Sequence, residues 1–188
     1  MTQQAQSQNS LQKAGEAEAF LQMYNPSYQL EICDDPGKCF FGDFPTLADI
    51  KRDYGKNVSM AWLVPQMFNL SEFCGVKEKM SKEQLKDTAY VIATEYYYLK
   101  VSELMLFFHR FKAGRYGRFY GNVDPLVITS ALREFCEERK TAIWKKESED
   151  AIKAREESMK NGITWDEYCR QTGQLHRIGK TPVIGSEP

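Results

Sequence analysis

The sequence predicts an all-α fold: a compact multi-helix domain, with a long polar helix near the C-terminus and irregular or disordered ends. Two observations carry this prediction. Apolar residues recur at helical spacing between Thr46 and Trp144, and helix-capping residues and glycines bound the segments that they form. With 188 residues, of which 42% are hydrophobic, the chain has enough apolar surface for one core.

The two ends of the chain are predicted to lie outside this core. Residues 1–19 are polar and low in complexity, which predicts a disordered leader. Residues 20–45 are predicted to form an irregular surface segment, because Pro26, Asp34-Asp35-Pro36-Gly37 and Pro45 interrupt their apolar residues. The helical core domain is then expected over 46–144, a projecting polar helix over 145–162, and a tail with one short helical turn over 163–188.

The first three helices of the core are marked by their ends. Thr46 and Asp49 can cap a short helix that Gly55 terminates. A second helix carries an apolar stripe that ends at Gly75, and its Pro65 is either a kink or a later helix start. Ser81 and Gln84 form a capping box for the third helix, whose apolar positions run to Leu99.

Two further helices follow. The fourth begins near Ser102, places three phenylalanines on one face and ends at Gly114. Asp124-Pro125 then supplies an N-cap and a proline at the first helical position. This last helix outruns the core, because it becomes polar all round beyond Trp144 before Asn161-Gly162 stops it.

The composition argues against several classes of protein. No window approaches the roughly 18 consecutive apolar residues of a membrane span, so we expect no membrane partner. The formal net charge of -1 gives no global attraction to nucleic acid. Five cysteines, odd in number and scattered, fit free thiols in a reducing compartment, which predicts a cytoplasmic location.

No catalytic constellation is recognised, so we expect no enzyme, no cofactor and no metal. Cys33 and Cys39 could in principle offer zinc ligands together with His109, but their spacing does not match the common zinc sites. The glycine-rich segment fits neither a nucleotide-phosphate loop nor a dinucleotide fingerprint, because no strand is predicted before it.

The most unusual segment is the basic, aromatic, glycine-punctuated run from His109 to Gly121. Cations that neutralise phosphates and rings that stack on bases are typical of single-stranded nucleic-acid binding. The predicted nucleic-acid-binding residues are Arg110, Lys112, Arg115, Tyr116, Arg118, Phe119 and Tyr120. In a simpler interpretation the aromatic residues pack the loop onto the helices, the glycines serve turns and the arginines are solvated.

The sequence from Met80 to Gly121, with its Gly-x-Tyr-Gly-x-Phe-Tyr-Gly loop, and from Asp124 to Arg139 resembles a family of small helical proteins. Its members come from anaerobic gut bacteria and their phages, and their function is uncharacterised. The resemblance covers the central third to half of the chain and implies mobile-element or phage cargo. The arrangement is also similar to helical accessory proteins that load helicases, which is a fold-level analogy.

Three hypotheses of function follow. The leading one is a non-enzymatic binding module that contacts single- or double-stranded nucleic acid, within a replication or mobile-element assembly. The alternative is a protein-interaction adaptor that acts through the polar helix and the tail, where Trp165 and Tyr168 are the predicted partner-binding residues. An enzyme of unrecognised type is third, and the sequence leaves the oligomeric state open.

Overall fold

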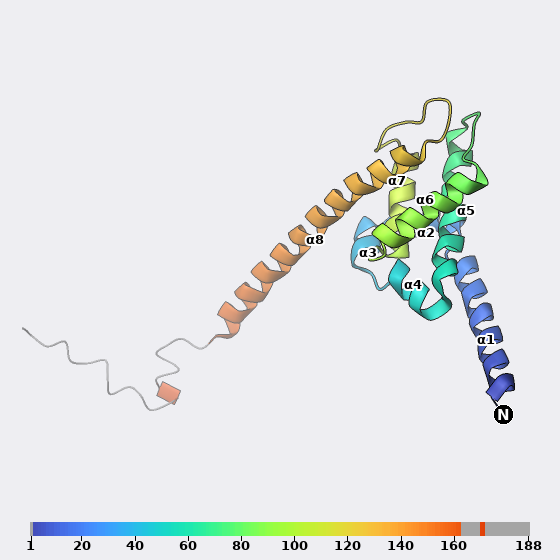
Figure 1. Cartoon of the computed structure of the whole chain (residues 1–188). Coiled ribbons are helices and arrows are strands. Elements are labelled where there is room, and N and C mark those ends of the chain that lie inside the picture. Colours follow the sequence, from blue (N-terminus) through green and yellow to red (C-terminus); the bar gives the residue numbers. More distant parts are fainter. Residues whose placement is uncertain (1, 163–169, 172–188) are drawn as a thin grey trace, which may run out of the picture. The chain divides into compact units, whose positions relative to one another are not determined.

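The computed structural model describes residues 2–162 and 170–171, and in these residues it contains helices and no strand (Figure 1). The all-α prediction is therefore confirmed. The helices are α1 (Thr2–Met23), the 3₁₀ helix η1 (Pro26–Tyr28), α2 (Gln29–Ile32), α3 (Pro36–Phe41), α4 (Leu47–Tyr54), α5 (Lys56–Cys74), α6 (Lys82–Glu95), α7 (Val101–Lys112) and α8 (Pro125–Asn161). Among the described residues, those up to Ile143 form one compact unit, and those from Trp144 onward belong to a second.

Helix α7 lies at the centre of the first unit. Its residues from Val101 to Phe108 are all buried, and it packs against α2, α3 and α5 (Figure 1). The Phe107 ring meets that of Phe135, from the first half of α8, at a centroid distance of 5.7 Å. Aromatic pairs of this kind add to the stabilisation that burial itself provides.

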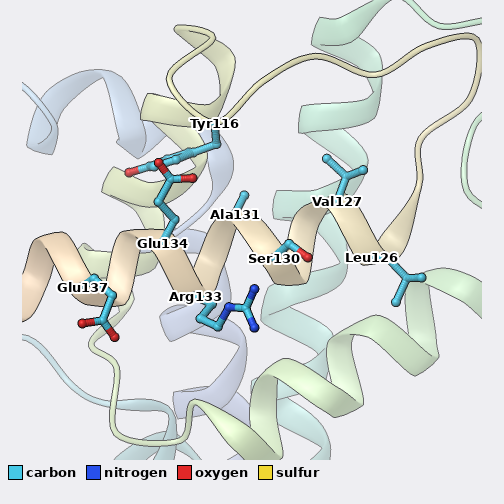
Figure 2. A pocket seen from close by; sticks show the side chains of 8 residues that line it. All are labelled: Tyr116, Leu126, Val127, Ser130, Ala131, Arg133, Glu134 and Glu137. Atoms are coloured by element: carbon cyan, nitrogen blue, oxygen red, sulfur yellow. The ribbon is translucent and has the colours of Figure 1, made fainter.

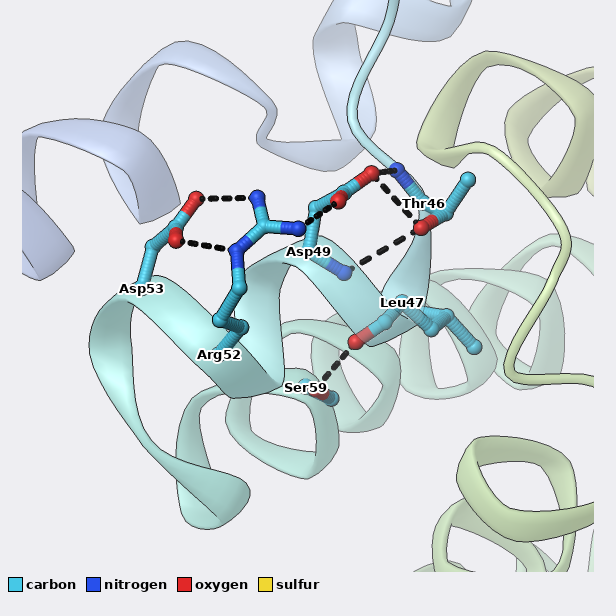
Figure 3. A network of polar contacts seen from close by, with 6 residues as sticks. All are labelled: Thr46, Leu47, Asp49, Arg52, Asp53 and Ser59. Carbon is cyan, nitrogen blue, oxygen red and sulfur yellow. Dashed lines mark hydrogen bonds and ion pairs between the residues drawn. The ribbon is translucent and has the colours of Figure 1, made fainter.

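The predicted capping boxes of α4 and α6 are confirmed. The Thr46 hydroxyl accepts from the Asp49 backbone N–H at 3.1 Å, and the Asp49 carboxylate accepts from the Thr46 N–H at 2.9 Å (Figure 3). Ser81 and Gln84 exchange the same two bonds at 3.2 and 2.8 Å. These bonds satisfy backbone donors that the first turn of a helix leaves without partners.

Of the two roles that the sequence left open for Pro65, a kink within α5 or a later start of the helix, the structure excludes the later start. The helix begins at Lys56, so Pro65 lies inside the helix and is not its first residue. Gly75 ends the helix in the left-handed conformation with a φ of 62°, as the glycine stop predicts. Pro65 is exposed and has no backbone N–H, so the helix lacks one hydrogen-bond donor at this position but continues.

The structure differs from the disordered leader predicted for residues 1–19, because α1 covers Thr2–Met23. The segment is polar, but it is rich in Gln and Ala, which are good helix formers. Its C-terminal end is also anchored: Phe20 is buried, and its ring lies 5.5 Å from that of Tyr54 in α4.

Residues 20–45 also differ from the irregular surface segment that was predicted. Pro26 and Pro36 start helices, with the side chains of Asn25 and Asp35 as N-caps. A proline at the first helical position loses no hydrogen bond, so these prolines mark helix starts and not irregular chain. The segment contributes to the core through buried side chains, namely Phe20, Ile32, Cys33, Cys39 and Phe40.

The long helix near the C-terminus is confirmed as a single helix, Pro125–Asn161, which opens and ends at the predicted residues. The side chains from 151 to 160 are all exposed. Lys145–Glu149 and Lys146–Asp150 are ion pairs one turn apart, as expected for a solvated helix. No helix in the described ranges is both long and apolar enough to cross a membrane.

Candidate nucleic-acid interface

The loop after α7 is folded onto its own domain. Gly114, Gly117 and Gly121 have φ values of 79°, 98° and 83°, a region that residues with a side chain rarely adopt. The turns at Gly114 and Gly117 direct Tyr116 inward, where it is 8% exposed and its ring lies 5.6 Å from that of Phe107. Tyr116 is therefore a core residue, and its predicted role in stacking on bases is wrong.

Glu138 of α8 gathers three side chains of this segment. It accepts from Arg110 Nη1 at 2.7 Å, pairs with Arg115 Nε at 3.0 Å, and accepts from the Tyr116 hydroxyl at 3.3 Å. Burial, followed by the Glu138 charge, raises the pKa of Tyr116 to about 12. The Glu138 carboxylate thus neutralises charge that the sequence assigned to phosphate binding. The guanidinium of Arg110 also lies over the Phe40 ring, 5.6 Å from its centroid, so this side chain is engaged within the domain, and its role in phosphate binding stays a prediction.

The remaining aromatic residues of the loop differ in exposure. Phe119 stacks on Phe111, with ring centroids 5.1 Å apart and an angle of 19° between the planes, and it is half-buried. Tyr120 is 87% exposed. The packing on Phe111 covers one face of the Phe119 ring, whereas Tyr120 is almost fully exposed, so the exposure of Tyr120 fits the stacking prediction better.

Lys112, at the end of α7, has neutral partners only. Its ammonium donates to Gln29 Oε1 at 2.8 Å and to Asn69 Oδ1, and the side chain is half-buried. Burial lowers the pKa of Lys112, and the nearby thiols of Cys33 and Cys74 partly offset this effect. Lys112 makes no ion pair with a carboxylate in the described part of the chain. Such a partly desolvated cation favours an anionic ligand.

An exposed phenylalanine of α5, Phe73, lies beside this cation. Its side chain is 63% exposed, and its ring centroid is 6.0 Å from Lys112 Nζ. Two hollows of about 380 and 390 Å³ have both residues in their walls; His109 lines the first, and Arg118 with Phe119 lines the second. We call Phe73, Lys112, Arg118 and these hollows the Phe73 surface.

The Phe73 surface was only partly predicted. Lys112, Arg118 and Phe119 are brought together there, whereas Arg110, Arg115 and Tyr116 meet at Glu138 and Tyr120 lines neither hollow. Phe73 was missed, although it is apolar and falls outside the stripe that α5 buries, and such a residue is a candidate for a surface role. The predicted partner-binding residues Trp165 and Tyr168 lie outside the described residues.

A third hollow, of about 500 Å³, lies between Tyr116 and the first half of α8 (Figure 2). Arg133 lines it together with two carboxylates, Glu134 and Glu137, and with the apolar Leu126 and Val127. Its charge is therefore less favourable to phosphate than that of the Phe73 surface. No cluster of three or more His, Cys, Asp or Glu side chains that could hold a metal is found within residues 2–162 and 170–171.

The fold and the surface together define an all-α protein with a basic and aromatic face. The chain matches the model of a family of unknown function, DUF6633, over residues 79–177, which is more than half of its length. It therefore belongs to that family. No curated protein and no solved structure matches the chain.

Proposed function

We propose that this protein is a non-enzymatic module that binds single-stranded nucleic acid on the Phe73 surface. One observation carries the proposal: an exposed aromatic ring, Phe73, lies between two hollows whose cations, Lys112 and Arg118, have no carboxylate partner in the described residues. Stacking on the ring and neutralisation of phosphate are the two interactions by which strands are held without regard to sequence.

The geometry favours a single strand over a duplex. Stacking on Phe73 needs a base whose face is free, and the bases of a duplex are stacked on one another. Lys112 and Arg118 line the hollow on the loop side of Phe73, so a phosphate can reach either cation from a base on the ring. A duplex could use only the cations, and its binding would be weaker.

Fluorescence anisotropy of labelled oligonucleotides at about 50 and 200 mM salt tests the proposal. Two phosphate contacts to a single strand give a log–log slope of about -1.4, so affinity should fall about sevenfold over this range. Arg118→Gln should reduce the fall to about threefold, because one contact is lost. Lys153→Gln, an exposed lysine on α8, is the matched control and should keep the wild-type slope. No binding at low salt, or equal affinity for a duplex, would refute the proposal.

The setting that we propose is a replication or mobile-element assembly in the bacterial cytoplasm. The resemblance of the Met80–Gly121 segment to proteins of gut bacteria and their phages supports the bacterial setting, and the four cysteines described, all free thiols, support a reducing compartment. Fractionation of cells that produce the tagged protein, before and after nuclease treatment, tests the location and the association together.

A specific observation also favours the second candidate function, an adaptor. Within the unit that begins at Trp144, α8 exposes Trp144, Ile152 and Met159 to 69%, 58% and 70%. Their spacing of eight and seven residues places them on one face of a helix, as in a helix that docks on a partner. Deletion from Thr164 onward tests the predicted tail, and Ile152→Ser tests this face. Association with a co-purifying protein that neither change weakens would refute the adaptor.

A further inference from the structure

Another hollow lined by cations lies at the other end of α5. It has a volume of about 490 Å³ and is formed by the end of α4, the start of α5 and the later part of α6. Its lining includes Lys51, Lys56, Lys86, Tyr90, Met60 and Ala93. We call it the Lys86 groove. Lys56 and Phe73 occupy the first and last turns of α5, about 25 Å apart along the helix axis, so the groove is separate from the Phe73 surface.

The three lysines of the groove are not neutralised. None of them makes an ion pair with a carboxylate in the described ranges. Arg52, the neighbour of Lys51, shows the contrast: its guanidinium is held by Asp49 at 2.7 Å and by Asp53 at 2.8 Å (Figure 3). The acidic residues at the end of α4 are thus engaged by Arg52, and three positive charges face one hollow without a counterion.

The groove also offers a ring and an apolar floor. Tyr90 is 59% exposed, while Met60 and Ala93 are half-buried. The hydroxyl of Ser59 is already used, because it donates to the Leu47 carbonyl at 3.2 Å (Figure 3). Thr94 likewise donates to the Tyr90 carbonyl at 2.6 Å. The free donors of the groove are therefore the three lysine ammonium groups, the Asn57 amide and the Tyr90 hydroxyl. Because the only charged groups among them are positive, the groove suits an anionic ligand with a flat apolar part.

We propose that the Lys86 groove binds a nucleoside phosphate, with its base against Tyr90 and its phosphates among Lys51, Lys56 and Lys86. The volume lies within the range of small-molecule sites, roughly 300–1,000 Å³. The first turn of α5 adds to the positive field, since Gly55 leaves it without a side-chain cap. This site does not depend on the proposed strand binding, because the two share no residue.

Isothermal titration of the full chain with ATP, and separately with inorganic tripolyphosphate, both without metal, tests the assignment. ATP should bind more tightly than tripolyphosphate, and Tyr90→Ala should remove that difference by weakening ATP about fivefold or more. Lys86→Gln should weaken both ligands by about two- to fivefold, since one exposed charge is lost. The control Lys153→Gln should change neither affinity.

The proposal would be overturned by the absence of ATP binding at low salt, by equal affinity for ATP and tripolyphosphate in the wild type, or by no effect of Lys86→Gln. A single-stranded oligonucleotide that displaces ATP and loses affinity in Lys86→Gln would assign the groove to a strand, and would also overturn it. Since Arg118→Gln tests the Phe73 surface alone, failure of one site is distinguishable from failure of the other. Circular dichroism of each variant checks that the helices are retained.

Discussion

Replacement of Glu138 by glutamine is the sharpest test of how the loop after α7 is held. Glu138 is 23% exposed and serves two arginines and the hydroxyl of Tyr116, at 2.7, 3.0 and 3.3 Å. Arg110 is only 16% exposed, so the substitution leaves a cation without its counterion in a poorly solvated place. Breaking a buried pair in this way costs about 3–5 kcal/mol. Because Glu138 retains some contact with solvent, we expect Glu138→Gln to lower the free energy of unfolding by about 2–4 kcal/mol.

Urea unfolding followed by circular dichroism measures this loss. With a slope of about 2 kcal/mol per molar urea, a loss of 3 kcal/mol moves the midpoint down by about 1.5 M. The neighbouring Glu137→Gln is the control, since its pair with Lys140 is exposed at both ends and is worth about 0–1 kcal/mol. Glu138→Gln should also lower the pKa of Tyr116, because the Glu138 charge helps to raise that pKa to about 12. A loss in Glu138→Gln no larger than that in Glu137→Gln would refute the reasoning.

Two further predictions concern α4 and the loop. The pKa of Asp49 is lowered, first by the hydrogen bond from the Thr46 side chain, so its contribution to stability is present above pH about 4 and is lost as the pH falls further. Asp49→Asn should therefore lower the free energy of unfolding by about 1 kcal/mol at pH 7 and by much less at pH 2. Urea midpoints at the two pH values measure this difference, and an equal loss at both would contradict the prediction. Gly114→Ala should cost about 1–2 kcal/mol for backbone conformation alone, because its φ is 79° and no atom lies within 4 Å of an added Cβ. Gly15→Ala in α1 meets equally open space without a positive φ and should not destabilise the protein, so a similar melting temperature for the two alanine variants would contradict the strain argument.

Capping residues and helix-end residues predicted most of the helices, because the contacts that start or end a helix join residues close in sequence. The capping boxes at Thr46 and Ser81 join residues three apart, and Pro125 and Gly162 mark the ends of α8. The errors at Pro26 and Pro36 have the same origin. A proline breaks a helix or begins one according to the residue before it, and the capping side chains of Asn25 and Asp35 make Pro26 and Pro36 helix starts.

The candidate site was less predictable, because it depends on contacts between distant parts of the chain. Lys112 receives its neutral partners from Gln29 and Asn69, which are 83 and 43 residues away. Glu138 neutralises Arg110 from 28 residues away. The sequence alone does not distinguish one cation from another, whereas the packing of the folded chain determines which cations a carboxylate neutralises. The loop sequence therefore indicated a basic surface near α7, but not which of its residues form it.

The affinity of Phe73→Ala for a single-stranded oligonucleotide tests the central claim most directly. Phe68→Ala is the control, since Phe68 is also an exposed phenylalanine of α5 but lines neither hollow of the Phe73 surface. If bases stack on Phe73, its loss should weaken binding by about 1–3 kcal/mol, or roughly 5- to 150-fold, in anisotropy titrations at low salt. Phe68→Ala should stay within about twofold of the wild type. Equal affinities for the two variants would contradict the claim that the strand lies on the Phe73 surface.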